Sequence, residues 1–290
     1  MAIGGGPLPS LGATSQAAAM SETPQSPQPG PAEPRVAATI LLLRDAPEFQ
    51  VLMVKRHHQI DFASGALVFP GGKTHVGDMD PAWADHCVGW HAFDDEQRTL
   101  RIGSIRESFE EAGILMAEHS DGRHFADACD LKVREAVDRG ETAFIDVVRG
   151  LGVKLRLDSL TVFARWITPT MMPKRFDTWF YCVRAPADQV AACDGRETVD
   201  AEWIAPAEIL RLELAGERTV IFPTRMNVQL LAEAVSAADC VSRADARTLV
   251  TVLPKVELRD GARFLVLPSD AGYGEVAEPM ERISAESAKR

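Results

Sequence analysis

A run of nine residues, Arg106–Ile114, constrains the fold of this chain more than any other segment. Apolar residues recur around it at helical spacing, which predicts one long helix over about 100–117 with one face in a core. Glu107, Glu110 and Glu111 then fall within a helix face about 100° wide. Carboxylates so close repel one another, and a divalent cation among them would make the arrangement favourable. The segment therefore predicts a metal site on a packed helix.

Two interpretations of these glutamates compete. A glutamate-rich helix face is usually just solvated, and a bare ExxEE favours that interpretation. Arg106 directly before the first glutamate and Gly113 two residues after the last one favour a metal site, because the fixed set RExxEExG rarely arises by chance. Upstream, the FPGG run at residues 69–72 supplies a loop whose backbone can approach an ion closely, which glycine permits at low cost.

Strand-like segments stand on both sides of this helical block. Val36–Arg44 and Phe49–Arg56 predict a β-hairpin joined by the turn at 45–48. Downstream, Leu160–Thr168 and Arg175–Arg184 predict strands that flank a proline-containing loop. Strands before and after helices predict a mixed α+β sandwich rather than an alternating doubly wound sheet. Further strands are expected at 66–70, 198–204 and 263–267, and further helices at 125–139, 142–151, 206–212 and 224–235.

The bulk composition limits the classes of partner. The chain has 290 residues and a net charge of −11, which repels nucleic acid and anionic lipid at long range. No run approaches the roughly 20 apolar residues that span a bilayer, so no membrane partner is expected. Five scattered cysteines without CxxC spacing favour free thiols in a reducing compartment. No secretory signal is visible, and a cytoplasmic location is the default expectation.

The two ends of the chain differ from its middle. Residues 1–34 contain no Lys or Arg and are rich in Pro, Gly, Ser, Ala and Gln, so they predict a disordered leader. Residues 35–268 hold the patterned segments and predict one domain. The small and polar residues 269–290 predict a flexible tail. Within the domain, the aromatic residues of 79–105 predict a small core that anchors this segment, in preference to a cover over the site.

Residues 72–114 resemble the Nudix box, Gx5Ex7REUxEExGU, in which U is an aliphatic residue. The first six residues match Gx5, Asp78 stands where the family has glutamate, and 106–114 match REUxEExGU with Ser108 at the first aliphatic position. Asp78 could support the metal ligands or cap a helix, or it could be an exposed loop acid. The spacer of seven residues has become 27 residues, 79–105, so an insertion interrupts the box. A surface loop absorbs such length at small entropic cost.

Other segments resemble one branch of the Nudix family. Trp166–Pro169, Lys174–Phe180 and a degenerate signature at Leu52–Gly72 are similar to segments of the long-insert coenzyme A diphosphatases of peroxisomes and their bacterial relatives. The interrupted box is also similar, and the similarity covers about residues 35–235. The resemblance implies a Nudix-type α/β/α sandwich with a mixed β-sheet, and extra helices inserted within and after the box at 72–114.

The resemblance also implies roles for the box residues. Glu107, Glu110 and Glu111, joined by the carbonyl of Gly72, would hold Mg²⁺ or Mn²⁺. Arg106 would pair with one of these carboxylates and orient it, as a member of the catalytic set. The general base is left open among the carboxylates, with Glu107 ranked first.

Several other charged residues have an ordinary alternative beside the functional one. Lys55, Arg56 and Arg175 could bind the diphosphate or the adenosine 3′-phosphate of a substrate, or could simply add solubilising charge at strand ends. Glu197 and Glu202 lie near a late strand where the family often adds a metal-binding acid. For either glutamate alone, an ordinary surface position is the better expectation.

The expected activity is metal-dependent hydrolysis of a phosphoanhydride bond in a nucleoside diphosphate linked to another moiety. Coenzyme A or acyl-coenzyme A is the preferred small-molecule substrate, which would give phosphopantetheine and adenosine 3′,5′-bisphosphate. The alternatives are an ADP-ribose or dinucleotide pyrophosphatase, and a non-catalytic nucleotide-binding module. The intact REx2EE set argues against the module, because a pure binder has no reason to keep three repelling acids. The sequence leaves a homodimer open.

Overall fold

The computed structural model describes residues 1–6, 32–56, 65–193 and 198–288. Residues 1–30 and the residues from 31 onward form separate units. The disordered leader expected at 1–34 therefore lies mostly outside the described residues, and its disorder stays a prediction.

A mixed sheet runs through the unit that begins at residue 31, and β1 (Arg35–Arg44) lies near its centre. β1 pairs in parallel with β9 (Phe176–Arg184) and in antiparallel fashion with β2 (Gln50–Arg56), so the predicted hairpin is confirmed. Eight described strands take part, in the order β10-β2-β1-β9-β8-β11, with β3 beside β2 and β4 beside β1. The other members are β3 (Leu67–Val68), β4 (Gly71–Lys73), β8 (Thr161–Ile167), β10 (Thr198–Ile204) and β11 (Thr251–Val252).

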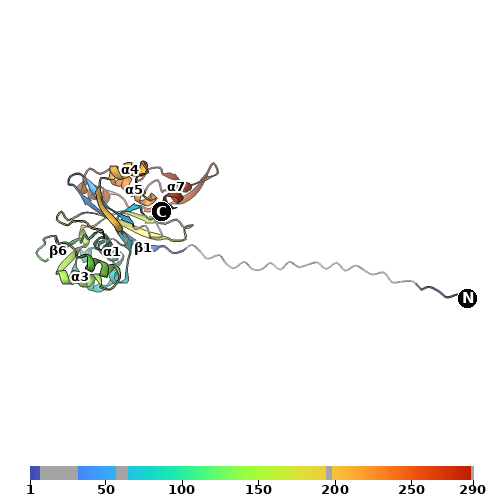
Figure 1. Ribbon diagram of the computed structural model, residues 1–290, viewed down its shortest axis with the longest axis horizontal. Coiled ribbons are helices and arrows are strands. Elements are labelled where there is room, and N and C mark those ends of the chain that lie inside the picture. The colour runs from blue at the N-terminus through green and yellow to red at the C-terminus, as the bar shows by residue number, and fades with distance from the viewer. Residues whose placement is uncertain (7–31, 57–64, 194–197, 289–290) are drawn as a thin grey trace. The chain divides into compact units, whose positions relative to one another are not determined.

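Successive side chains of β1 enter two different cores, because neighbouring residues of a strand point to opposite faces of the sheet. Ile40 and Leu42 pack in the cluster that contains the apolar side chains of α1 (Asp95–Ala112), whereas Leu41 and Leu43 pack with those of α5 (Phe222–Leu231). Figure 1 shows α1 and α3 (Phe144–Leu151) on one side of the strands, with α4 (Pro206–Leu214), α5 and α7 (Met280–Ala288) on the other. The expected α/β/α sandwich with a mixed sheet is confirmed.

α1 begins earlier and ends earlier than the hydrophobic pattern indicates. Asp94 caps its first turn, with Oδ1 accepting a hydrogen bond from the N–H of Gln97 at 2.8 Å. At the other end Gly113 adopts a left-handed conformation with φ +71°, and its N–H donates to the carbonyl of Phe109. The predicted continuation to residue 117 is therefore wrong, because Ala117 begins β6 (Ala117–His119).

The segment 79–105 forms short 3₁₀ turns and the first half of α1. Trp83 is buried, its ring centroid lies 5.6 Å from that of Phe144, and its Nε1–H donates to the carbonyl of Gly77 at 2.9 Å. Trp90 and Phe93 are partly buried against the same core cluster. The aromatic residues thus anchor the segment in a core, as the sequence predicts. The turns and strands here are η1 (Val76–Met79), η2 (Pro81–His86), β5 (Cys87–Val88) and η3 (Trp90–Ala92).

The region after α1 adds a small layer of its own. β5, β7 (Val153–Arg156) and β6 form a second sheet in that order. α2 (Leu131–Asp138) is shorter than the helix expected at 125–139, because Asp130 caps it and accepts from the N–H of Lys132 at 2.8 Å. η4 (Leu157–Ser159) leads from β7 into β8 of the main sheet.

The described part of the predicted flexible tail is built into the fold. β14 (Ala277–Pro279) pairs with β13 (Ala262–Val266), which also pairs with β12 (Lys255–Arg259), and α7 follows directly. Met280 and Ile283 pack against the second core cluster, to which α6 (Ala237–Ala246) also contributes. Too few apolar residues stand at regular spacing here for the sequence to indicate this helix. None of the helices in the described residues has the length and apolar content needed to cross a membrane.

Candidate active site

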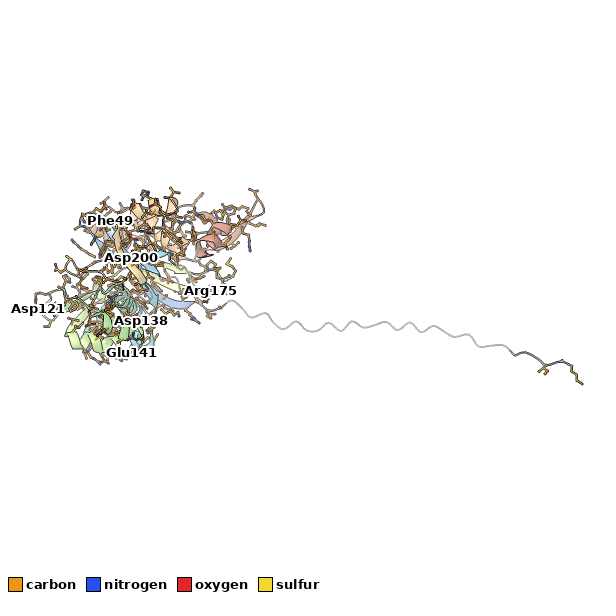
Figure 2. All side chains as sticks on the ribbon, in the orientation of Figure 1. Phe49, Asp121, Asp138, Glu141, Arg175 and Asp200 are labelled. Atoms are coloured by element: carbon orange, nitrogen blue, oxygen red, sulfur yellow. The ribbon has the colours of Figure 1, made fainter. Side chains whose placement is uncertain are left out.

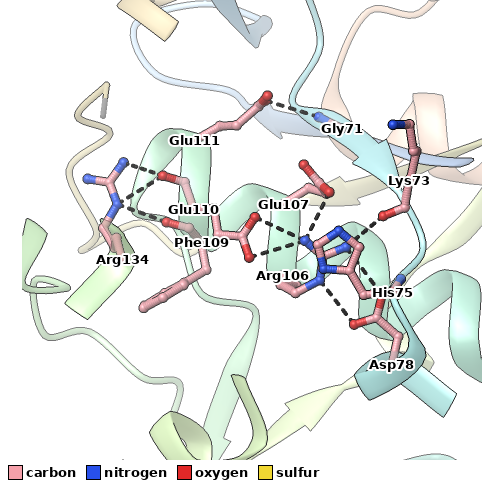
Figure 3. Close-up of polar contacts among 10 residues, drawn as sticks. All are labelled: Gly71, Lys73, His75, Asp78, Arg106, Glu107, Phe109, Glu110, Glu111 and Arg134. Atoms are coloured by element: carbon pink, nitrogen blue, oxygen red, sulfur yellow. Dashed lines mark hydrogen bonds and ion pairs between the residues drawn. The ribbon is translucent and has the colours of Figure 1, made fainter. Parts of the chain in front are cut away.

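The last two turns of α1 lie against the glycine loop around β4, and the box glutamates reach toward it (Figure 3). The N–H of Gly71 donates to Oε2 of Glu111 at 3.1 Å. Gly72 lies beside Glu107 so closely that a Cβ there would be 2.5–2.6 Å from the carboxylate atoms of that glutamate. Glycine at residue 72 is therefore needed for the close approach of Glu107, and close approach of this loop to an ion stays a prediction.

Arg106 is buried and joins the loop to the helix. Its Nε–H donates to Oδ1 of Asp78 at 3.0 Å, and its Nη2–H donates to the carbonyl of Lys73 at 2.8 Å. Its Nη1–H donates to Glu107 at 2.9 Å and to Glu110 at 3.0 Å. The guanidinium thus holds two of the three box glutamates, as expected for a group that orients them. Asp78 is only 2% exposed and so is no exposed loop acid: besides binding Arg106 it caps η1, because its Oδ2 accepts from the N–H of His75 at 2.8 Å.

The site concentrates negative charge in a buried place. Asp78, Glu107 and Glu110 are buried around the guanidinium of Arg106, and Glu111 is buried beside the amide of Gly71. Burial, and after it repulsion from Glu107, raises the pKa of Glu110 to about 8 against the attraction of Arg106. Burial also disfavours the charge of Arg106, but Glu107 and Asp78 outweigh that effect and hold its pKa above the usual value.

The end of α1 is held by groups that sequence reasoning did not single out. Arg134 of α2 donates from Nε–H to the carbonyl of Phe109 at 2.9 Å and from Nη2–H to that of Glu110 at 2.9 Å. From the other side, the N–H of Ala192 donates to the carbonyl of Ala112 at 2.9 Å. Gly113 indicates where the helix ends, and the last carbonyls of a helix need hydrogen-bond donors from elsewhere. The sequence does not show which side chain supplies these donors.

The donor groups suit Mg²⁺ or Mn²⁺ in kind. Carboxylate oxygens are hard ligands, and the space beside Glu107 is open only because residue 72 has no side chain. In the described part of the chain, however, no three Asp, Glu, His or Cys side chains converge closely enough to hold an ion. Arg106 engages both Glu107 and Glu110, whereas the Gly71 amide engages Glu111.

The predicted substrate-binding residues lie away from this cluster or have other contacts. Lys55 shares a face of β2 with Met53, which packs in the core cluster on the side of the sheet opposite α1. Arg175 is buried, and its guanidinium donates to the carbonyls of Thr168 at 3.0 Å and Ala32 at 2.8 Å, which is a structural role. In Figure 2, Asp121 lies on the left of the folded unit and Arg175 on its right.

The remaining candidates for substrate or metal binding are Arg56, Glu197 and Glu202. The side chain of Arg56 is outside the described residues, and so is Glu197. Glu202 of β10 lies 3.7 Å from Arg218, an ion pair at the surface. Substrate contact by Lys55 and Arg56 stays a prediction, as does metal binding by the late glutamates.

A solved structure shares this architecture. The Nudix hydrolase from Alicyclobacillus acidocaldarius superposes with a TM-score of 0.62 at 26% identity, covering 72% of this chain and 96% of that chain. The sandwich, the glycine loop against the helix and the REx2EExG set on that helix define a class of protein. In its fold and in this set of residues the chain is similar to the Nudix hydrolases.

Within this class, residues 91–228 match the family model of the NUDT19 Nudix domain. Acyl-coenzyme A diphosphatase NUDT19 of Xenopus laevis is 26% identical over 56% of this chain, and the match spans 54% of that protein. The human protein of the same name is 26% identical, with 90% of this chain and 86% of that protein covered. The particular kind of Nudix hydrolase that the chain resembles is therefore NUDT19.

Proposed function

We propose that this protein hydrolyses a phosphoanhydride bond in a nucleoside diphosphate linked to another moiety, with coenzyme A or acyl-coenzyme A preferred. The products would be phosphopantetheine, or its acyl form, and adenosine 3′,5′-bisphosphate. The observation that carries the proposal is the burial of three box glutamates on a Nudix-like fold, with Glu107 and Glu111 against the Gly71–Gly72 loop and Glu110 on Arg106. The Xenopus and human relatives, which are acyl-coenzyme A diphosphatases by name, support the choice of substrate.

In this proposal the three glutamates and the Gly72 carbonyl hold Mg²⁺ or Mn²⁺. The ion, when bound, would offset the charge that develops on the phosphate oxygens. Arg106 restricts the carboxylates of Glu107 and Glu110 to one region beside the loop, so that little ordering remains when substrate binds. Binding of the ion requires the glutamates to exchange part of their contacts with Arg106 and Gly71 for contacts with the cation.

A product screen with Mn²⁺ tests the substrate class. Coenzyme A, an acyl-coenzyme A, ADP-ribose and a dinucleotide are each incubated with the protein, and the nucleotide products are separated by chromatography. We expect the highest kcat/KM for coenzyme A or its acyl form. A far higher value for ADP-ribose or the dinucleotide would contradict the substrate assignment and leave the hydrolase class intact.

Variants of the glutamates test the site itself. Glu110→Gln and Glu111→Gln should each lower Mn²⁺-dependent turnover about 10- to 100-fold or more, as loss of groups that bind or support a metal does. Glu96→Gln is the matched control, since Glu96 is an exposed acid on the first turn of the same helix. Substrate binding without any turnover in the parent protein would favour the non-catalytic module. A cytoplasmic location and a homodimer stay predictions from the sequence.

A further inference from the structure

Arg134 is a buried cation on a short helix at the surface. Its exposed fraction is 2%, although Leu131 and Val133 on the same helix are 45% and 38% exposed. Burying a guanidinium is costly unless its donors find acceptors. Arg134 is therefore expected to have hydrogen-bond acceptors at this place, and those acceptors show which segments it holds.

The acceptors are backbone carbonyls at the end of α1 and in the segment after β9. Nε–H and Nη2–H donate to the carbonyls of Phe109 and Glu110, and Nη2–H also donates to the carbonyl of Ala192 at 2.8 Å. The last four carbonyls of a helix have no partner within it, so an external donor stabilises the terminal turn. One planar fork thus joins three segments that are distant in sequence, and Figure 3 shows its bonds to Phe109 and Glu110.

The chain leaves room for this fork. Gly113 ends α1 with φ +71°, and a Cβ on it would lie 2.9 Å from Nη1 of Arg134. Glycine is therefore required twice here, for the backbone conformation and for the guanidinium. A positive charge at the C-terminal end of the helix also interacts favourably with the helix dipole.

The turn that Arg134 holds is the one that carries Glu110 and Glu111. Glu110 has its carbonyl on Arg134 and its carboxylate on Arg106, so it is fixed from both ends. Thr198 adds a bond from Oγ1–H to the carbonyl of Glu111 at 3.2 Å. Fraying of this turn would move both glutamates relative to the glycine loop.

We infer that Arg134 is a positioning residue of the active site: by fixing the backbone of the last turn of α1, it holds Glu110 and Glu111 in place for metal binding. This inference rests on the proposed function. It does not give Arg134 any contact with substrate or ion.

Gln189 offers a matched control. It is buried, accepts from the N–H of Leu115 at 2.8 Å, and donates to the carbonyls of Leu115 at 2.9 Å and Phe125 at 2.7 Å. It is therefore a polar staple of similar kind just beyond the helix end, but it does not hold the turn with the glutamates. Gln189→Met should therefore lower the stability of the protein without displacing Glu110 and Glu111.

The experiment compares Arg134→Met, Arg134→Lys and Gln189→Met with the parent protein, well below the melting temperature of each. Mn²⁺ binding is measured directly by electron paramagnetic resonance titration, and amide hydrogen exchange is followed at Gly113 and Ile114. We expect Arg134→Met to weaken Mn²⁺ binding about tenfold or more, as loss of supporting groups around a metal does. It should also speed exchange at both amides and lower kcat at saturating Mn²⁺ with little change in KM.

Arg134→Lys should bind Mn²⁺ with an affinity between those of Arg134→Met and the parent. An ammonium keeps the charge, but it cannot reach all the carbonyls that the guanidinium reaches. Arg134→Lys also tests the inference if Arg134→Met does not fold. Gln189→Met should keep the parent affinity for Mn²⁺ even if its melting temperature falls. Equal Mn²⁺ affinity in Arg134→Met, Arg134→Lys and the parent would overturn the inference, and so would equal weakening in Gln189→Met.

The same data separate this inference from the proposed function. If the parent protein binds Mn²⁺ and Glu110→Gln does not, the metal site stands, and the Arg134 variants decide the positioning role alone. If the parent protein binds no Mn²⁺ and turns over none of the four substrates, the proposed function fails and the positioning role fails with it.

Discussion

Gly72 leaves the carboxylate of Glu107 the room that any other side chain would occupy. The Cβ of an alanine there would lie 2.5–2.6 Å from that carboxylate, which is the far end of a flexible side chain and can move away. We therefore expect Gly72→Ala to fold with a change in the free energy of unfolding within about 1 kcal/mol. Turnover should fall about 10- to 100-fold, because Glu107 is displaced from the loop. Denaturant unfolding and kcat/KM measure the two effects.

Gly77→Ala is the control for this loop. Gly77 lies in the same glycine-containing stretch, and a Cβ on it would meet nothing within 4 Å. Its turnover should equal that of the parent. If Gly72→Ala were as active as Gly77→Ala, the close approach of the loop to Glu107 would have no part in catalysis.

At the scale of elements, α1 shows what the sequence can and cannot predict. The position of Glu107, Glu110 and Glu111 on one helix follows from local spacing, and so does the glycine end at Gly113. The start of the helix depends on Asp94, a capping residue in a segment without a dominant hydrophobic period. The donors to the helix end come from Arg134, Ala192 and Thr198. Tertiary contacts of this kind have no local signature, so sequence alone does not find them.

α7 gives an element-scale prediction about pH, because a buried ion network docks it. Glu286 of α7 and Glu278 of β14 lie 3.5 and 3.2 Å from Arg225 of α5, and Arg282 lies 3.3 Å from Glu286. Burial raises the pKa of Glu286, and the two arginines only partly oppose it. The folded protein thus binds this proton more tightly than the unfolded chain, whose glutamates titrate near about 4.3. Protonation of Glu286 therefore contributes fully to the free energy of unfolding below the pKa of the unfolded chain. The contribution is lost as pH rises through the pKa of the folded state.

Glu286→Gln removes this proton. Urea unfolding at pH 5 and pH 7.5 should show that the parent gains stability relative to Glu286→Gln at the lower pH. Glu281→Gln, an exposed acid on the same helix, should show no such relative gain. A parent that instead loses stability relative to Glu286→Gln at pH 5 would mean that its ion pairs outweigh the effect of burial.

At the scale of the molecule, the order of strands is the part that sequence patterns leave open. The hydrophobic runs predict β1 and β9 as strands, but not that they pair in parallel across more than a hundred intervening residues. The small sheet β5-β7-β6 joins the insertion to the residues after α1 and adds to the layer on the site side. Long-range pairing is decided by packing of whole layers, which the family resemblance supplied and the residue pattern did not.

A metal held between the glycine loop and α1 would tie two parts of this sandwich and raise the stability of the whole unit. A ligand that binds only the folded state at a hundred times its Kd stabilises by about 2.7 kcal/mol. For a domain of this size that is a rise in Tm of about 5–10 °C. We expect Mn²⁺ to raise Tm by this amount, EDTA to reverse it, and the double variant Glu110→Gln/Glu111→Gln to show little rise. Glu96→Gln should behave as the parent. A full rise in the double variant would place the ion elsewhere in the molecule and remove the glutamates of α1 from the metal site.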